Sequence, residues 1–129
     1  MNNKKHIEVV AAVIKKDDKF FCCQRGQKNE CAFKWEFPGG KIEPGETREE
    51  ALKREIKEEL DCNIIIEKFI TTINYEYNTF LLTMHVYLCN LKDNEPILLE
   101  HKASLWCDKD KLETLDFAEA DRLLLKFIK

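Results

Sequence analysis

Three glutamates near the middle of the chain have a spacing that suits metal-assisted chemistry. Glu55, Glu58 and Glu59 stand at positions i, i+3 and i+4, and on a helix that turns by about 100° per residue they share one side. Like charges this close destabilise a helix unless a cation lies among them. Arg54 adjoins the cluster and can pair with one carboxylate, so negative charge remains in excess.

A solvated acidic helix face is the ordinary explanation of such a cluster, because charged residues make up 35% of the chain. Two features favour a functional site instead. The glutamates border the apolar stripe of the helix, and a loop rich in glycine and proline, Gly39 to Gly45, precedes them. Clustered carboxylates beside unobstructed backbone are the hard oxygen ligands that Mg²⁺ or Mn²⁺ takes when it bridges to substrate phosphates.

The segment that starts at Gly40 resembles the Nudix box, G-x5-E-x7-R-E-U-x-E-E-x-G-U, in which U is a bulky aliphatic residue. The positions that match are Gly40, Glu46, Arg54, Glu55, Ile56, Glu58 and Glu59. Asp61 stands where the pattern has glycine, and Cys62 where it has an aliphatic residue. Aspartate is among the residues that tolerate the left-handed conformation of a helix-ending glycine. Neither departure removes a carboxylate.

The resemblance implies a metal-dependent hydrolase with Mg²⁺ or Mn²⁺ as its cofactor. The metal ligands that it implies are Glu55, Glu58, Glu59 and the carbonyl of Gly39. Arg54 would orient Glu55 through a charge-assisted hydrogen bond, whereas Gly40 and Glu46 would be structural, with Glu46 tying the loop to the helix.

A further acidic residue is expected from a loop downstream of the box. Family members often place a metal ligand or a base there, and in this chain Glu100 occupies that position. Its alternative is an ordinary loop acid. Glu55 and Glu100 both stay candidates for the general base, and the neighbouring His101 is interpreted as a solvated loop residue.

The resemblance covers nearly the whole chain and is greatest to the MutT and CTP pyrophosphohydrolase group. These enzymes convert a nucleoside triphosphate to a monophosphate and pyrophosphate. The resemblance implies that Arg25 and Lys41 contact phosphate, and that Phe37, Val9 and Leu82 line a base pocket. The ordinary alternatives are a surface arginine at a strand end and three plain core residues.

Asp121 falls where these enzymes place a residue that reads the base. An ionised carboxylate accepts hydrogen bonds only, which suits the exocyclic amine of cytosine and equally the N1–H and amino edge of a guanine-type base. It therefore does not separate CTP, dCTP or 5-methyl-dCTP from oxidised 8-oxo-dGTP. Its structural alternative is an acid at a helix N-terminus, which the helix dipole favours.

Other substrates and roles stay open at this point. A dinucleoside polyphosphate or ADP-ribose is the alternative substrate, although the proline that ADP-ribose-cleaving members carry after the box is absent. A nucleotide-binding Nudix module without catalysis is less favoured, because the chain keeps every box glutamate.

The composition excludes several other classes of protein. The chain has 129 residues, which suits a single domain over 1–129, and its net charge of −3 provides no basic field for a nucleic-acid polymer. It contains no apolar run of about 20 residues for a membrane helix and no signal peptide. The six cysteines show no paired spacing and are interpreted as free thiols in a reducing compartment. We expect a cytoplasmic monomer or homodimer with a small-molecule nucleotide as its partner.

One helix must position the glutamates. It is predicted from Thr47 to Leu60, because Thr47 and Glu50 form a capping box and Leu52, Ile56 and Leu60 form a buried stripe.

The other elements suggest an α+β fold with mixed strands. Strands are predicted around Ile7–Ile14, Phe20–Arg25, Trp35–Phe37, Ile64–Tyr77, Phe80–Leu91 and Ser104–Cys107. The run Pro38-Gly39-Gly40 is expected to stop the third of them. A short helix is suggested at Asp108–Thr114, and a last amphipathic helix covers Glu119–Ile128, with Leu123, Leu124, Phe127 and Ile128 turned inward. The resemblance refines this to the Nudix α/β/α sandwich, with a mixed sheet and a loop–helix–loop box.

Overall fold

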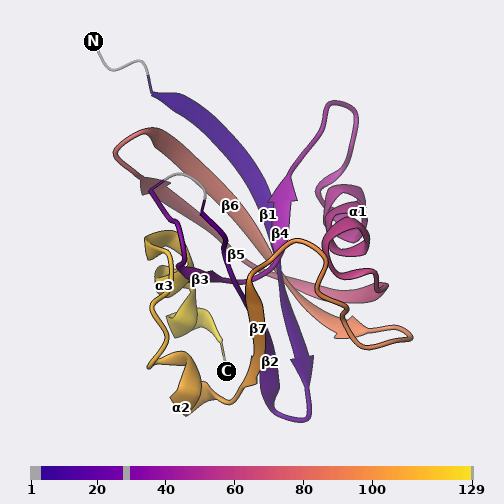
Figure 1. Cartoon of the computed structure of the whole chain (residues 1–129). Coiled ribbons are helices and arrows are strands. Elements are labelled where there is room, and N and C mark those ends of the chain that lie inside the picture. The colour runs from indigo at the N-terminus through magenta and orange to yellow at the C-terminus, as the bar shows by residue number, and fades with distance from the viewer. Residues whose placement is uncertain (1–3, 28–29, 129) are drawn as a thin grey trace.

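The computed structural model describes residues 4–27 and 30–128. A mixed sheet forms its middle layer, with helix α1 on one side and α3 on the other (Figure 1). Strand β1 (Lys5–Lys16) lies at the centre of the sheet, parallel to β6 (Phe80–Leu91) and antiparallel to β2 (Lys19–Gln24). Strand β5 (Ile64–Glu76) pairs with β6 in antiparallel fashion.

Three shorter strands complete the sheet. β3 (Trp35–Glu36) and β7 (Ala103–Cys107) both pair with β2, whereas β4 (Gly39–Lys41) pairs with β1. The predicted strands and the mixed α+β architecture are therefore confirmed.

Strand β3 ends before Pro38, as predicted, but Gly39 and Gly40 then begin a further strand, β4, which the sequence did not predict. A Cβ added at Gly39 would lie 1.9 Å from the carbonyl oxygen of Val10 in β1. Only glycine allows the two backbones to come this close. The glycines thus continue the sheet and bring the start of the box against its central strand.

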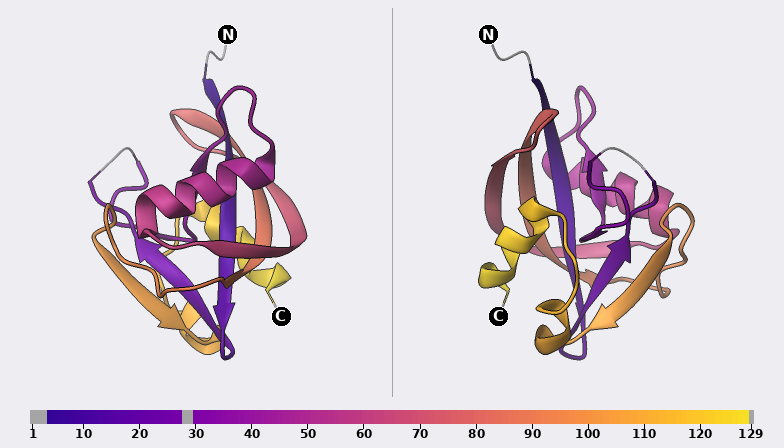
Figure 2. Two further views of the ribbon diagram at one scale, coloured as in Figure 1. Left: turned by 90° about the vertical axis from the view of Figure 1, so that its right-hand side faces the viewer. Right: turned by 60° about the vertical axis from the view of Figure 1, so that its left-hand side comes forward.

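Helix α1 (Arg48–Leu60) covers one face of the sheet and crosses β1 in the left view of Figure 2. Thr47 and Glu50 form both hydrogen bonds of the predicted capping box. The helix ends at Asp61, which adopts the left-handed conformation with φ 46° and ψ 43°. The apolar stripe is fully buried, and it consists of Ala51, Leu52, Ile56 and Leu60.

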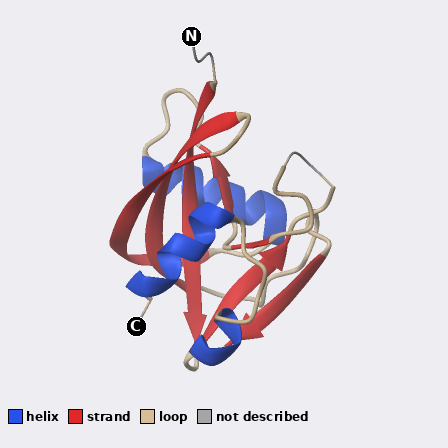
Figure 3. Cartoon of the chain, turned by 90° about the vertical axis from the view of Figure 1, so that its left-hand side faces the viewer, coloured by secondary structure: helices blue, strands red, loops and turns tan. Residues whose placement is uncertain are grey.

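The opposite face carries α2 (Lys109–Leu112), α3 (Glu119–Leu124) and a 3₁₀ turn over Leu125–Phe127; α3 lies in front of the sheet in Figure 3. Leu124 and Ile128 are buried as expected.

The inward orientation predicted for Leu123 and Phe127 is wrong, since they are 41% and 38% exposed. The buried side of α3 is centred on Ala120, Asp121 and Leu124, which leaves Leu123 at its rim. The tighter 3₁₀ turn then changes the angular spacing before Phe127.

In the described part of the chain, no helix is long and apolar enough to cross a membrane.

Candidate metal and nucleotide site

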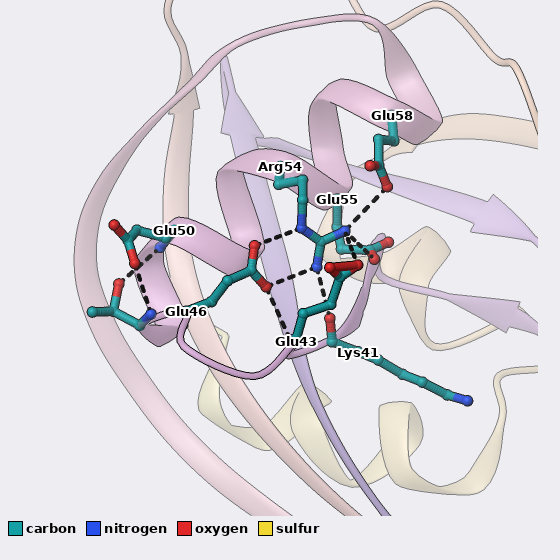
Figure 4. Close-up of polar contacts among 8 residues, drawn as sticks. Lys41, Glu43, Glu46, Glu50, Arg54, Glu55 and Glu58 are labelled. Atoms are coloured by element: carbon teal, nitrogen blue, oxygen red, sulfur yellow. Dashed lines mark hydrogen bonds and ion pairs between the residues drawn. The ribbon is translucent and has the colours of Figure 1, made fainter.

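Arg54 is the centre of the acidic cluster on α1 (Figure 4). Its guanidinium donates two hydrogen bonds to Glu46, at 2.6 and 2.9 Å, and one each to Glu55 at 2.9 Å and Glu58 at 3.1 Å. The sequence predicted pairing with one carboxylate, but the structure shows four, because Arg54 also forms an ion pair with Glu43 at 3.6 Å. Five donors in a planar fork allow one arginine to hold several acids in fixed orientations.

The loop before α1 is fastened by the same guanidinium. Arg54 donates to the carbonyl of Lys41 at 3.0 Å, and Glu46 accepts the backbone N–H of Glu43 at 2.9 Å. The hydrogen bonds from Arg54 lower the pKa of Glu46, so this carboxylate stays ionised. A Cβ at Gly40 would lie 2.2 Å from Glu55 Oε2, which explains why the box needs glycine there.

Glu55 and Glu59 are the two glutamates of α1 that are partly withdrawn from water. Burial raises the pKa of Glu55, and the charges of Glu58 and Glu100 add to this, although Arg54 opposes it. Burial, together with Glu36 and Glu55, raises the pKa of Glu59 to about 8. The buried Oε1 of Glu59 has no hydrogen-bond partner among the described residues. This part of the site therefore holds more negative charge than its protein partners neutralise.

Glu100 lies in an exposed loop next to the end of α1. The backbone N–H of Leu99 donates to the carbonyl of Glu59 at 3.1 Å, and the charge of Glu100 raises the pKa of both Glu55 and Glu59. Within residues 4–27 and 30–128, no three His, Cys, Asp or Glu side chains converge as a closed metal cage would require. The structure therefore does not bring the predicted ligands Glu55, Glu58, Glu59 and Glu100 together around one point.

A pocket of about 520 Å³ begins at these carboxylates and includes residues from both faces of the sheet. Its volume falls in the range of small-molecule sites. All the predicted substrate residues line it, namely Val9, Arg25, Phe37, Lys41, Leu82 and Asp121, together with Gly39, Gly40, Glu55 and Glu59. Glu58 and Glu100 are not among the lining residues. The side chain of Lys41 extends away from the carboxylates in Figure 4.

Asp121 is buried in this pocket, with 5% of its surface exposed. The backbone N–H of Phe37 donates to its Oδ2 at 2.9 Å. Burial raises the pKa of Asp121, and the charge of Glu36 adds to this effect. Burial thus favours the neutral carboxyl more than it would be favoured in a solvated aspartate, and a neutral carboxyl can both donate and accept, whereas an ionised one only accepts.

The segment before α3 places Asp121 next to the pocket wall. Trp35 exchanges two backbone hydrogen bonds with this segment, donating to Asp116 and accepting from Ala118, both at 2.9 Å. The ring of Phe117 stacks on Phe37 at 5.4 Å between centroids. Strand β3 and the start of α3 thus form one wall.

Arg25 is held by Glu36 rather than lying free at a strand end. Its Nη1 donates to Glu36 Oε1 at 2.9 Å, and its side chain is 24% exposed. The expectation that His101 is a solvated loop residue is wrong. Its side chain is 7% exposed, and its Nε2 lies 2.9 Å from Glu36 Oε2.

Sequence reasoning also missed several residues of the pocket. Glu36 is the most informative of them, because an acid inside the apolar run Trp35–Phe37 is itself a signal of a buried polar role. Tyr77 accepts the backbone N–H of Ala120 at 2.9 Å with its hydroxyl oxygen. The sequence offers no comparable signal for Cys31, Tyr77, Phe80, Met84 and Ala118, which also line the pocket.

The chain is similar to known proteins over nearly its whole length. A family model described as "NUDIX domain" matches residues 9–127. The chain is 35% identical over 124 residues to a CTP pyrophosphohydrolase of Escherichia coli (strain K12), a match that covers 95% of this chain and 90% of the relative. It is 32% identical to an 8-oxo-dGTP diphosphatase of Haemophilus influenzae, with 95% and 91% covered.

A solved structure of MutT from methicillin-resistant Staphylococcus aureus 252 superimposes with a TM-score of 0.77. It is 40% identical in sequence, and the match covers 95% of each chain.

Proposed function

The chain belongs to the Nudix family, and from that premise we propose that it hydrolyses a nucleoside triphosphate to a nucleoside monophosphate and pyrophosphate. One observation carries the proposal. A single pocket of about 520 Å³ is lined both by the box carboxylates Glu55 and Glu59 and by the buried pair of Phe37 and Asp121. A nucleotide has two parts that such a lining would suit: a polyanionic phosphate chain at the carboxylates, bound through metal, and a planar base at Phe37 and Asp121.

The reaction is proposed to depend on Mg²⁺ or Mn²⁺. Glu55, Glu58, Glu59 and Glu100, with the carbonyl of Gly39, would hold the metal. The unpartnered Oε1 of Glu59 and the raised pKa values of Glu55 and Glu59 support this, because both indicate uncompensated acidic oxygens. When bound, a divalent metal offsets the charge on phosphoryl oxygens and lowers the pKa of water.

The side chains of the box have separate tasks in this scheme. Arg54 fixes the orientation of Glu55 and Glu58, so neither carboxylate has to be ordered when substrate arrives. A base must accept a proton from the attacking water, and the raised pKa of Glu55 makes it a stronger base than a solvated glutamate. Glu100 is the second candidate for this role.

Arg25 is proposed to contact the phosphates. The ion pair with Glu36 restrains its guanidinium at the pocket wall, while its buried Nε has no partner among the described residues. Lys41 lines the same pocket with an exposed side chain and is the second cation within reach of an anionic substrate.

Asp121 is proposed to read the base. In the protonated state that burial favours, its carboxyl can donate to N3 of cytosine and accept from the exocyclic amine. The same state can donate to O6 of 8-oxoguanine and accept from the N7–H that oxidation creates. Both substrates named for the bacterial relatives therefore fit one carboxyl group.

The six free, buried cysteine thiols support a reducing compartment such as the cytoplasm.

The test is pyrophosphate release with Mg²⁺ from CTP, dCTP, 5-methyl-dCTP, dGTP, 8-oxo-dGTP, ADP-ribose and a diadenosine polyphosphate. We expect a cytidine nucleotide or 8-oxo-dGTP to be cleaved fastest, with the monophosphate as co-product and no reaction after chelation. Activity confined to ADP-ribose or the diadenosine compound would contradict the proposal. Tight nucleotide binding without any turnover would identify a binding module instead.

A further inference from the structure

A half-buried carboxylate outside the box joins two parts of the site. Glu36 has a side chain that is 17% exposed, and its two oxygens have different partners. Oε1 accepts from Arg25, and Oε2 accepts from Nε2 of His101, each at 2.9 Å. His101 directly follows Glu100 in the chain, so this hydrogen bond reaches the loop that carries the acid.

Besides this hydrogen bond, the loop around Glu100 is held by its backbone and by Leu98, which packs against the hydrophobic cluster beside α1. Three backbone N–H groups fasten it: those of Ile97 to Leu60, Leu99 to Glu59 and Lys102 to Gln24, at 2.7, 3.1 and 2.9 Å. Ile97 and Leu99 are 50% and 57% exposed. Within residues 97–102, His101 is the one residue whose side chain forms a hydrogen bond to another side chain in the described structure.

Glu36 determines which ring nitrogen of His101 donates. Because a carboxylate can only accept, Nε2 carries a hydrogen, and the buried Nδ1 has no partner among the described residues. The ring is therefore oriented from one side by a carboxylate and enclosed on the other. A bond to a carboxylate is stronger than a neutral hydrogen bond, so it can hold a loop that lacks regular structure.

We propose that His101 is a positioning residue, which holds Glu100 beside the glutamates of α1 through its hydrogen bond to Glu36. The inference rests on the proposed function, because it assigns Glu100 to the metal site. The physical reason is entropic: an acid on a free loop must be ordered each time it binds, whereas a tethered one is already in place. Since Glu36 also holds Arg25, the acid and the phosphate-binding cation share one anchor.

A double-mutant cycle tests whether His101 acts through Glu100. The variants are His101→Leu, Glu100→Gln and the pair, and the readouts are kcat and the Mn²⁺ affinity of the protein without nucleotide. In the wild-type background, His101→Leu should lower kcat or Mn²⁺ affinity by about 10–100-fold, as expected when a group that orients a ligand is lost. In the Glu100→Gln background the same change should have little further effect.

Two matched variants separate this role from a general packing effect. His101→Gln keeps an N–H at the distance of Nε2 and should recover most of the loss. Lys102→Ala removes the next side chain, which lies over the ring of Phe33 at 5.6 Å and makes no hydrogen bond to Glu36. It should behave like the wild type in both readouts.

Amide hydrogen exchange of the metal-free protein adds a readout that does not require activity. His101→Leu should speed exchange at Leu99 and Lys102, while exchange in α1 stays unchanged; faster exchange throughout the protein would instead show a packing defect and overturn the proposal.

Equal losses from His101→Leu in both backgrounds would also overturn it, as would a Glu100→Gln variant with unchanged kcat and Mn²⁺ affinity. If the wild type cleaves no nucleotide, the proposed function fails, but the Mn²⁺ cycle and the exchange data still decide the role of His101.

Discussion

The two faces of the sheet build the pocket in different ways. On the α1 face, the acids lie within one short stretch of sequence, are partly solvated, and are oriented by Arg54. On the α3 face, Asp121 is buried, and its hydrogen-bond donor Phe37 lies 84 positions away in the sequence. The first region concentrates charge, and the second offers a shape and a hydrogen-bond pattern. We therefore expect substitutions on the α1 face to change the rate of the reaction, and substitutions on the α3 face to change the preference among bases.

The sharpest test of this separation is Glu58→Gln. Among the described residues Glu58 contacts Arg54 alone, and its side chain is 55% exposed, so the fold should tolerate the change. The rate should fall for every nucleotide by on the order of 10²–10³-fold, because a bound metal supplies several kcal/mol of charge stabilisation. Steady-state kinetics across the nucleotide panel measures this.

The control for this variant is Glu49→Gln, which neutralises an exposed acid in the first turn of the same helix. It should leave the rate unchanged. Near-normal turnover of Glu58→Gln would show that Glu58 is not a metal ligand.

The opposite face is tested by Asp121→Ala and Asp121→Asn. Loss of the carboxyl in the alanine variant should lower kcat/KM for the preferred base by about 10–100-fold, the usual discrimination of a bidentate base contact, while turnover stays metal-dependent. The asparagine variant presents one donor and one acceptor, as a protonated carboxyl does, and should keep the preference. Equal losses on every nucleotide would contradict the base-reading role.

The same contrast explains which features the sequence could predict. The capping box of Thr47 and Glu50 and the buried stripe of α1 depend on residues within one helix, so their periodicity is visible without any tertiary information. The left-handed conformation at Asp61 also follows from a local rule about helix ends.

Features that need two distant segments were missed or misread. Nothing near His101 indicates that Glu36, 65 positions away, would accept its Nε2 hydrogen bond. The pairing of Gly39 with β1 depends on the close approach of another strand, and so strand β4 was not predicted. The exposure of Leu123 depends on which side of a short helix meets the sheet.

The raised pKa of Glu59 predicts a pH-dependent response to Mg²⁺. Its pKa is about 8 in the folded protein, against an ordinary value of 4.5 for glutamate. A raised folded pKa means that ionisation opposes folding, so the metal-free protein should lose stability as the pH rises between these two values. Metal binds the ionised form. The increase in melting temperature caused by Mg²⁺ should therefore grow as the pH rises and level off above about pH 8.

Thermal unfolding with and without Mg²⁺, from about pH 6 to about pH 9, brackets this pKa and measures the effect. Glu59→Gln is the control, since an amide does not titrate, and its response to Mg²⁺ should be small and flat. A shift in the wild type that does not change over this range would contradict the assignment of Glu59 as a metal ligand. It would also contradict the inference that the α1 face holds more negative charge than its protein partners neutralise.

The smallest expected effect is that of Asp61→Gly, which restores the residue of the box pattern. Asp61 has φ 46° and ends α1 directly after the glutamates. Glycine adopts this conformation without the steric cost that other residues carry. The exposed ion pair of Lys57 and Asp61, at 3.2 Å, contributes little. The variant should therefore gain about 0.5–1 kcal/mol in free energy of unfolding, measured by urea denaturation.

Asp61→Ala is the matched comparison, and it should lose stability because it keeps the steric cost and lacks the polar side chain. Turnover should stay unchanged in both variants, since the backbone already places Glu58 and Glu59 correctly. A loss of rate in Asp61→Gly would show that the Asp61 carboxylate takes part in the site. The departure from the family pattern would then affect chemistry as well as the end of the helix.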